Sequence, residues 1–330
     1  MIRSPFSAAL LAVALFVSVS SVAFGDKPRQ RNFSFDYGVT INGVTKGDEV
    51  RIWLPIPRNE HRVQNTKMVS STLPGEGKET REEKYGNRMI YRSLKADSDE
   101  PISASVTYEI QRQEVKGLEQ PGKAPALGAD RERLYLSANR RVPIKGIPLT
   151  WNRNLKDVVE TARDIYERVD AHVRYDKSKP GYGNGDVMWV CDSKFGNCTD
   201  FHSLFISMAR ASNIPARFEI GFPLPTDKTT GTIGGYHCWA NFYTHDHEWV
   251  PVDISEADKH PELKEYYFGS LTPDRVSFTV GRDIDLAPKQ SGEPLNYFVY
   301  PYVEINGKKA TKEQLALKFE FKDMKVNEQN

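Results

Sequence analysis

Apolar and polar residues alternate with a period of two over much of the first third of the chain. The alternation runs from about residue 31 to residue 115 and is clearest over 33–41, 50–56 and 102–110. It predicts antiparallel strands with one buried and one solvated face. We therefore expect an all-β sandwich domain over 26–125. Its role would be recognition or scaffolding, because it contains no cluster of catalytic residue types.

The pattern changes after a Gly- and Pro-rich linker at 116–129. Apolar residues then recur at helical spacing over 155–173, behind a predicted N-cap at Asn154. A second turn-to-helix signal lies at 196–205. Strand-like runs follow at 216–222, 236–243, 249–254, 276–280 and 297–305. Helices mixed with antiparallel strands predict an α+β domain over 126–330.

The first 25 residues have the three-part pattern of a secretory signal peptide. Arg3 precedes an apolar run at 8–17, and small residues follow at 21–25. The run is shorter than a comfortable membrane span. We expect a signal peptide at 1–25, export to the periplasm or the medium, and no membrane association after cleavage. A membrane anchor is the alternative.

Positive and negative charges balance along the chain. Lys and Arg number 45 and Asp and Glu number 44, and only Arg3 of these lies within 1–25, so the remaining chain is neutral. A neutral chain without a basic stripe has no electrostatic attraction for nucleic acid or acidic lipid. We therefore expect neither as a partner, and the sequence predicts no particular oligomeric state.

Cys198 lies in the first turn of the helix that follows Asn197. Unpaired backbone N–H groups and the positive end of the helix dipole favour a thiolate at that position. A nearby histidine would lower the pKa of the thiol further. The alternative is a buried structural cysteine. The other cysteines leave the redox state open, because a Cys191–Cys238 disulfide frees Cys198 whereas a Cys191–Cys198 disulfide blocks it.

A cysteine nucleophile needs a base and a group that orients the base. His237 begins one predicted strand and Asp253 ends the next. If the two strands form a hairpin across 244–247, their near-equal arms place these side chains almost opposite each other. Asp253 would accept from one ring nitrogen and leave the other for Cys198. As alternatives, Asp253 caps a following helix, and His202, four residues after Cys198, is the base.

A zinc site is a further alternative, since Cys198, His202, His237 and Cys238 have the residue types of zinc ligands. Adjacent residues on a strand point to opposite faces of the sheet. His237 and Cys238 are therefore not expected to bind the same ion. We expect no metal and no organic cofactor.

Three segments together resemble the bacterial transglutaminase-like superfamily, within a similar region of about 130–290. They read GNCTDFHSLF at 196–205, GYHCWA at 235–240 and WVPVD at 249–253. The resemblance implies a papain-like core, in which a helix bearing the cysteine packs on an antiparallel sheet bearing the histidine and the aspartate. It implies Cys198 as nucleophile, His237 as base and Asp253 as orienting acid. Asn197-Cys198 and Trp189 are the candidates for the oxyanion site, with the backbone N–H of Cys198 as the preferred donor.

The resemblance also implies an activity and a class of substrate. We expect an exported thiol enzyme that acts on amide bonds of peptides or proteins through an acyl-enzyme at Cys198. Water as acyl acceptor would make it an amidase or peptidase, whereas an amine would make it an acyltransferase, and the sequence leaves both open. The alternative is a non-catalytic module that binds a peptide or the cell wall and retains the fold.

Overall fold

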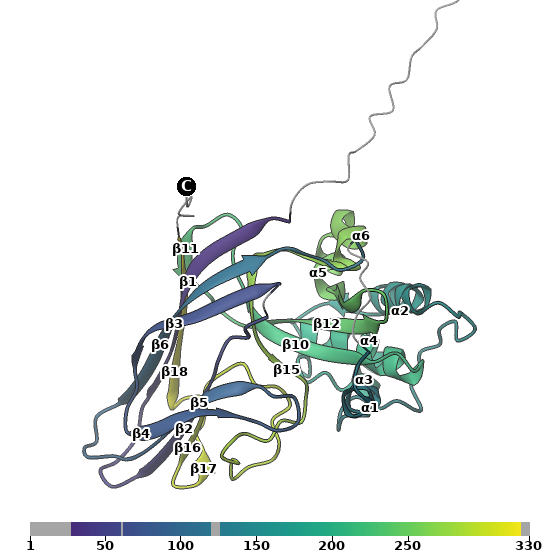
Figure 1. Cartoon of the computed structure of the whole chain (residues 1–330). Coiled ribbons are helices and arrows are strands. Elements are labelled where there is room, and N and C mark those ends of the chain that lie inside the picture. Colours follow the sequence, from purple (N-terminus) through teal and green to yellow (C-terminus); the bar gives the residue numbers. More distant parts are fainter. Residues whose placement is uncertain (1–27, 61, 120–125, 325–330) are drawn as a thin grey trace, which may run out of the picture.

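The computed structural model describes residues 28–60, 62–119 and 126–324. Two sheets lie on one side of the molecule, and a third sheet lies among the helices on the other side (Figure 1). The signal peptide predicted at 1–25 lies outside the described residues and stays a prediction. Among the residues that the structure describes, no helix has the length and apolar character needed to cross a membrane.

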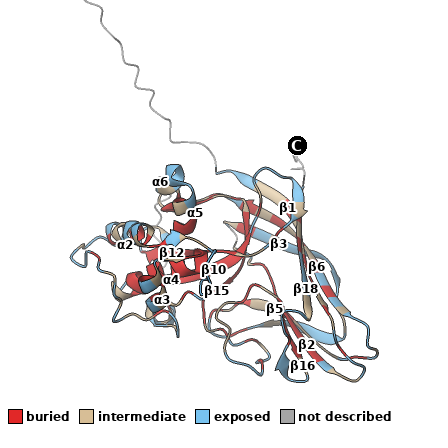
Figure 2. Ribbon diagram, turned by 180° about the vertical axis from the view of Figure 1, so that it is seen from behind, coloured by how far each residue is buried: buried red, intermediate tan, exposed pale blue. Residues whose placement is uncertain are grey.

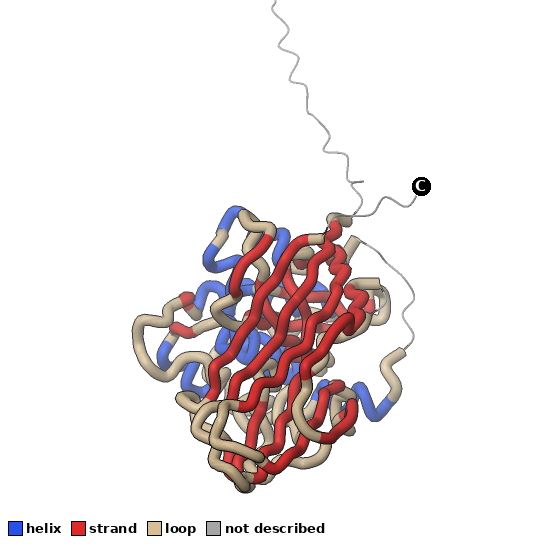
Figure 3. Tube along the Cα trace, turned by 90° about the vertical axis from the view of Figure 1, so that its left-hand side faces the viewer, coloured by secondary structure: helices blue, strands red, loops and turns tan. Residues whose placement is uncertain are grey.

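The first sheet combines strands from both ends of the chain, in the order β11-β18-β1-β6-β3. Its strands are β1 (Gln30–Ile41), β3 (Gln64–Thr72), β6 (Ile102–Gln113), β11 (Thr230–Thr232) and β18 (Leu315–Asp323). β1 pairs antiparallel with β6 over its whole length and with β18 from Phe33 to Ile41. The long strands run side by side in Figure 3. The alternating apolar residues at 33–41 are buried, as their period of two predicts.

The second sheet has the order β17-β16-β2-β5-β4. Its strands are β2 (Glu49–Pro55), β4 (Glu76–Arg81), β5 (Arg88–Lys95), β16 (Tyr302–Ile305) and β17 (Lys308–Lys309). The C-terminal strands, which the sequence assigned to the α+β domain, thus pair with N-terminal strands in both sheets. Residues 26–125 alone complete neither sheet. Strand pairing between distant segments has no local signal, so the pattern along the chain did not predict it.

The third sheet, in the order β13-β12-β10-β15, carries the helices. Its strands are β10 (Ala216–Pro223), β12 (His237–Thr244), β13 (Glu248–Val252) and β15 (Arg275–Val280). The helices packed near it are α2 (Val158–His172), α3 (Val187–Ser193) and α4 (Cys198–Ala211). α4 is buried from Cys198 to Arg210 because it packs against β10 and β12 as well as α2 and α3 (Figure 2).

The helix predicted over 155–173 starts later than expected. α2 begins at Val158, and its N-cap is Asp157, whose side chain accepts the backbone N–H of Glu160 at 2.9 Å. Asn154 was therefore the wrong cap. Ala162, Ile165, Tyr166 and Val169 of the predicted apolar stripe are buried, whereas Val158 is exposed. Asp is as good an N-cap as Asn, so residue type alone did not distinguish them.

Short elements complete the described structure. They are α1 (Ala129–Leu136), α5 (Ile254–Lys259), η1 (Pro261–Leu263), α6 (Lys264–Tyr267), β7 (Val115–Lys116), β8 (Arg174–Tyr175), β9 (Phe195–Gly196) and β14 (Ser270–Leu271). β7 pairs with β14, and β8 pairs with β9 in parallel. The second pair holds the segment that leads directly into α4.

Aromatic side chains join the first sheet to the third. The ring of Phe222 on β10 lies 5.4 Å from that of Phe35 on β1 and 4.5 Å from that of Phe319 on β18. Phe278 on β15 lies 5.3 Å from Phe222. These residues belong to one hydrophobic cluster that also contains the buried face of α4. The strand-rich part and the helical part therefore share a core.

We expect Phe319→Ala to lower the free energy of unfolding by about 3–5 kcal/mol, because it removes a buried ring from this shared core. The matched control is Leu317→Ala on the same strand, where the side chain is 42 % exposed, against 4 % for Phe319. The control should change stability by less than about 1 kcal/mol. Urea unfolding of both variants measures the difference. Equal, small effects would mean that β18 does not contribute to the core.

Candidate active site

Cys198 is the first residue of α4, and a capping box fixes the start of that helix. The side-chain oxygen of Asn197 accepts the N–H of Thr199 at 2.9 Å, and the carboxylate of Asp200 accepts the N–H of Asn197 at 2.9 Å. The predicted turn into a helix is therefore present. The thiol lies at the positive end of the helix dipole and is 3 % exposed.

Asp200 also holds the glycine-rich loop that precedes the cysteine. Its carboxylate accepts the N–H groups of Gly183 at 2.7 Å and Gly185 at 2.9 Å. A Cβ atom at Gly196 would lie 2.5 Å from the Asp200 side chain, so only glycine fits there. One buried carboxylate thus ties the loop to the N-terminus of α4, beside Cys198.

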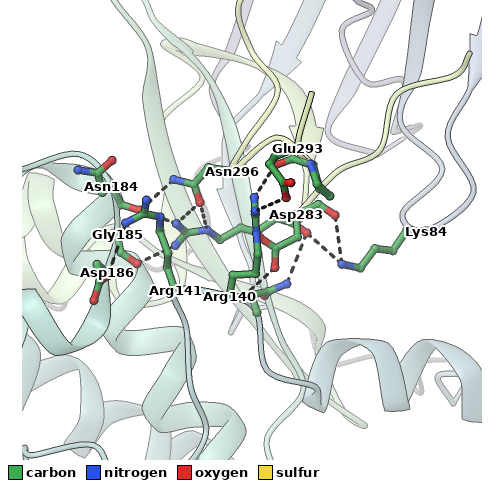
Figure 4. Close-up of polar contacts among 12 residues, drawn as sticks. Lys84, Arg140, Arg141, Asn184, Gly185, Asp186, Asp283, Glu293 and Asn296 are labelled. Carbon is green, nitrogen blue, oxygen red and sulfur yellow. Dashed lines mark hydrogen bonds and ion pairs between the residues drawn. The ribbon is translucent and has the colours of Figure 1, made fainter. Parts of the chain in front are cut away.

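A buried arginine fixes the same loop from the other side. The Arg282 guanidinium donates to the carbonyl oxygens of Asn184 at 2.6 Å and Gly185 at 3.1 Å, and to the hydroxyl of Ser203 on α4. Asn296 donates to the same Asn184 oxygen at 2.9 Å. Figure 4 shows Asn184 and Gly185 beside Asn296 in this network. The loop and the nucleophile helix are therefore positioned together.

The predicted hairpin brings His237 and Asp253 together. β12 and β13 pair in a register that places Ala240 opposite Val252. His237 is the first residue of β12, and Asp253 directly follows β13. The ring Nε2 of His237 lies 2.7 Å from Oδ2 of Asp253. Because Nε2 is used in this way, Nδ1 is the ring nitrogen left for Cys198.

Asp253 is both an orienting acid and a helix cap. Oδ1 accepts the N–H of Glu256 in the first turn of α5 and the hydroxyl of Ser255, each at 3.2 Å. Oδ2 accepts from His237 and also from Nη1 of Arg275 at 2.9 Å. The two interpretations of Asp253 made from the sequence are therefore compatible, because each uses a different oxygen.

Arg275 is a site residue that sequence reasoning missed. Its guanidinium lies on β15 and also packs over the ring of Trp239, 5.0 Å from the centroid. Burial disfavours ionised Asp253, but the charges of His237 and Arg275 hold the pKa of Asp253 well below its usual value. Arg275 lies 22 residues beyond Asp253, and no local motif links the two positions.

The thiol of Cys198 and the ring of His237 form a hydrogen-bonded pair. Burial disfavours the thiolate, but hydrogen bonds from Cys238 and His237, and the charge of His237, hold the pKa of Cys198 well below its usual value. Burial likewise disfavours the imidazolium, but the charge and hydrogen bond of Asp253, with Cys198, raise the pKa of His237 to about 10. Both directions favour a thiolate–imidazolium pair near neutral pH.

Cys238 interacts with Cys198 as well. Neighbours on a regular strand point to opposite faces, yet both His237 and Cys238 form hydrogen bonds with Cys198. His237 is the first residue of β12, where regular alternation starts. The pairing of β12 with β10 is regular here, with Ile220 opposite Cys238 and Gly221 opposite His237, and the register shift of β10 at these residues lies on its other edge, against β15.

His202 orients Cys238 and is unsuited to be the base. Its Nε2 accepts the backbone N–H of Ile254 at 3.0 Å, so the proton of the neutral ring is on Nδ1. That Nδ1 lies 3.8 Å from Sγ of Cys238. Burial lowers the pKa of His202 to about 4, so the ring is neutral at pH 7.

The zinc alternative and the disulfide alternatives both involve Cys198 and Cys238. All three cysteines are free thiols in the structure. Within the described ranges, no group of three or more His, Cys, Asp or Glu side chains is arranged to hold a metal ion. Cys198, His202, His237 and Cys238 instead form the hydrogen-bond network described above.

Tyr236 is a second residue that the sequence did not single out. Its hydroxyl lies 2.8 Å from Oγ1 of Thr199 and accepts from the side chain of Asn197 at 3.1 Å. It thus links the residue before His237 to the two residues that flank Cys198. A tyrosine directly before the predicted base was the available signal.

Trp189 lies on α3, and its oxyanion role stays a prediction. Its ring packs edge-on against Phe195 at 5.2 Å and so closely against Gly181 that a Cβ atom there would lie 2.7 Å from the indole. These contacts place Trp189 against the loop and β9. The backbone N–H of Cys198, at the N-terminus of α4, remains the other oxyanion candidate.

We expect Cys238→Ala to slow alkylation of Cys198 at about pH 6 by roughly tenfold or more, because it removes a donor to the thiolate. Cys238→Ser retains a donor and should have a smaller effect. Cys191→Ala, which removes a buried thiol on α3, is the matched control and should leave the rate unchanged. Alkylation rates with peptide mapping measure this. Unchanged rates in Cys238→Ala would show that the thiol contributes nothing to Cys198.

Comparison with known proteins identifies the family of the helical part. Residues 149–254 match the family model described as the transglutaminase-like superfamily, core domain. An uncharacterized protein of Haemophilus influenzae is 26 % identical over 348 residues, which cover 90 % of this chain and 94 % of the relative.

One solved structure shares the fold at low sequence identity, and a second shows weaker similarity. A protein from Cytophaga hutchinsonii, named as a candidate cysteine protease, is 14 % identical, covers 91 % of this chain and 92 % of its own, and has a TM-score of 0.54. The periplasmic domain of TgpA from Pseudomonas aeruginosa is 14 % identical, covers 71 % of this chain and 90 % of its own, and has a TM-score of 0.35. Residues 149–254, which contain Cys198, His237 and Asp253, thus match the transglutaminase-like superfamily.

Proposed function

We propose that this protein is an exported thiol enzyme that acts on amide bonds of peptides or proteins. The observation that carries the proposal is the position of His237, whose Nε2 is held 2.7 Å from Asp253 while the ring also bonds the thiol of Cys198. This is the arrangement that activates a cysteine nucleophile. The exported location is proposed from the signal-peptide pattern at 1–25 alone.

The first half of the proposed reaction forms an acyl-enzyme. The Cys198 thiolate attacks the amide carbonyl carbon, a C–S bond forms, and the carbonyl π electrons move to the oxygen. The N–H of Cys198 is the donor placed to bind that oxyanion. When the intermediate collapses, the C–N bond breaks and the His237 imidazolium gives its proton to the leaving amine.

The second half releases the acyl group to an acceptor. His237, now neutral, takes a proton from water or from an amine as it attacks the thioester carbonyl. The Cys198 thiolate leaves, and the thiolate–imidazolium pair is restored. Water makes the protein an amidase or peptidase, and an amine makes it an acyltransferase. Asp253 keeps the imidazole in the same orientation through both halves.

Alkylation of Cys198 should be fast well below the free-thiol pKa of about 8.5. We expect this because the pKa of Cys198 is lowered and that of His237 is raised, so both groups stay charged through neutral pH. His237→Ala should move the midpoint of the rate–pH profile upward, towards that of a free thiol. A small reagent such as iodoacetamide suits a thiol that is 3 % exposed. An unperturbed wild-type profile would favour the non-catalytic binding module.

Cys198→Ala should abolish turnover and leave the fold intact, because it shortens one side chain of the site.

Asp253→Asn should lower kcat by up to about 10⁴-fold, because the imidazole of His237 is then no longer held in the orientation and tautomer that the reaction needs. Cys191→Ala serves as the control with unchanged activity. A panel of peptides and proteins, with and without a primary amine acceptor, measures released amine and new amide. Full activity in Cys198→Ala would end the proposal.

A further inference from the structure

A cavity separate from the Cys198 site is lined by arginines. It has a volume of about 280 Å³ and lies where the end of β2, the turn between β4 and β5, α1 and the strands β10 and β15 meet. Its charged lining residues are Arg58, Arg81, Arg88, Arg131 and Arg217, with no Asp or Glu among the described lining residues. Such a lining has the charge and the donors to attract an anion.

Buried guanidinium groups near the cavity outnumber the carboxylates that pair with them. Arg58 pairs with Glu60 at 3.1 Å, and Arg217 pairs with Glu219 at 3.3 Å. Arg112, which is 1 % exposed, instead donates to the side chain of Gln64 at 3.4 Å. Three guanidinium groups thus share two carboxylates, while the nearby buried carboxylate of Glu82 accepts backbone N–H groups of Tyr85 and Asn87. Burial lowers the pKa of Arg112 to about 10, so it still carries its charge at neutral pH.

The same three arginines have donors without acceptors. Among the residues that the structure describes, the buried Nε–H groups of Arg58, Arg112 and Arg217 meet no hydrogen-bond partner. The Arg217 side chain is 8 % exposed and lines the cavity, as does that of Arg58. Buried donors and buried positive charge are both costly when they are left uncompensated. An oxyanion in the cavity would compensate both at once.

The cavity is open to solvent on the side of two further arginines. Arg81, on β4, and Arg131, on α1, are exposed, and neither forms an ion pair with the other described residues. The guanidinium fork matches carboxylate and phosphate oxygens equally well. The volume lies just below the usual range of ligand pockets, about 300–1,000 Å³. The occupant is therefore small.

We propose that this cavity is a binding site for a small oxyanion, either a carboxylate or a phosphate group. Arg58 and Arg217 contact it from within, and Arg81 and Arg131 guide it at the entrance. The site is independent of the reaction proposed at Cys198. Arg217 and Gly221, the partner of His237, are four residues apart on β10, which separates the two sites by about 13 Å along the strand.

Titration calorimetry on the full chain, at constant ionic strength, tests the proposal with inorganic phosphate, acetate and chloride. Phosphate or acetate should bind, whereas chloride should not. The double variant R81Q/R131Q should lose at least tenfold in affinity. It should fold as the wild type does, because the side chains of Arg81 and Arg131 are both exposed. The matched control is Arg133→Gln on the same helix, an exposed arginine that pairs with Asp130 and lies outside the cavity lining; it should bind as the wild type does.

The three anions and the variants distinguish results that support the proposed anion site from results that overturn it. Binding of phosphate alone or of acetate alone supports the site and identifies its ligand group. Equal heats for all three anions, or equal affinity in R81Q/R131Q and Arg133→Gln, would overturn the proposal. Alkylation of Cys198, measured on the same samples, should stay at the wild-type rate in every arginine variant, so the result is independent of the function proposed for that thiol.

Discussion

The buried carboxylate of Asp253 connects three elements through its two oxygens. Oδ2 accepts from His237 at the start of β12 and from Arg275 on β15, while Oδ1 accepts from the first turn of α5. A carboxylate that is 0 % exposed stays ionised only with such a set of donors. The ionised form in turn raises the pKa of His237, and His237 keeps Cys198 charged. The reactivity of the thiol therefore depends on groups two contacts away from it.

The third sheet brings this charge network and the arginine cavity into one layer. β10 carries Arg217 near one end and Gly221, which pairs with His237, near the other. Between them, Phe218 and Ile220 are buried in the common hydrophobic cluster. Apolar packing holds β10 in place, and β10 in turn sets the distance between the Cys198 site, where the charges are paired, and the arginine-lined cavity, where positive charge is in excess.

Local features of the chain were predictable, and distant pairings were not. The start of α4 at Cys198 and the hairpin that joins His237 to Asp253 are encoded by neighbouring residues, so the sequence indicated both. The contacts of Arg275 with Asp253 and of His202 with Cys238 join separate elements, and the return of β18 to β1 spans almost the whole chain. Such contacts depend on register and topology, which residue patterns along one segment do not carry.

The central place of β1 in its sheet has a consequence for how the newly made protein folds. β18, which covers one edge of β1 from Phe33 to Ile41, is synthesised long after β1. Until β18 has been made, that edge has unpaired backbone groups, which are a template for pairing with other chains. A nascent chain of this protein therefore needs its edge protected, by a chaperone or by delayed folding, until β18 is available.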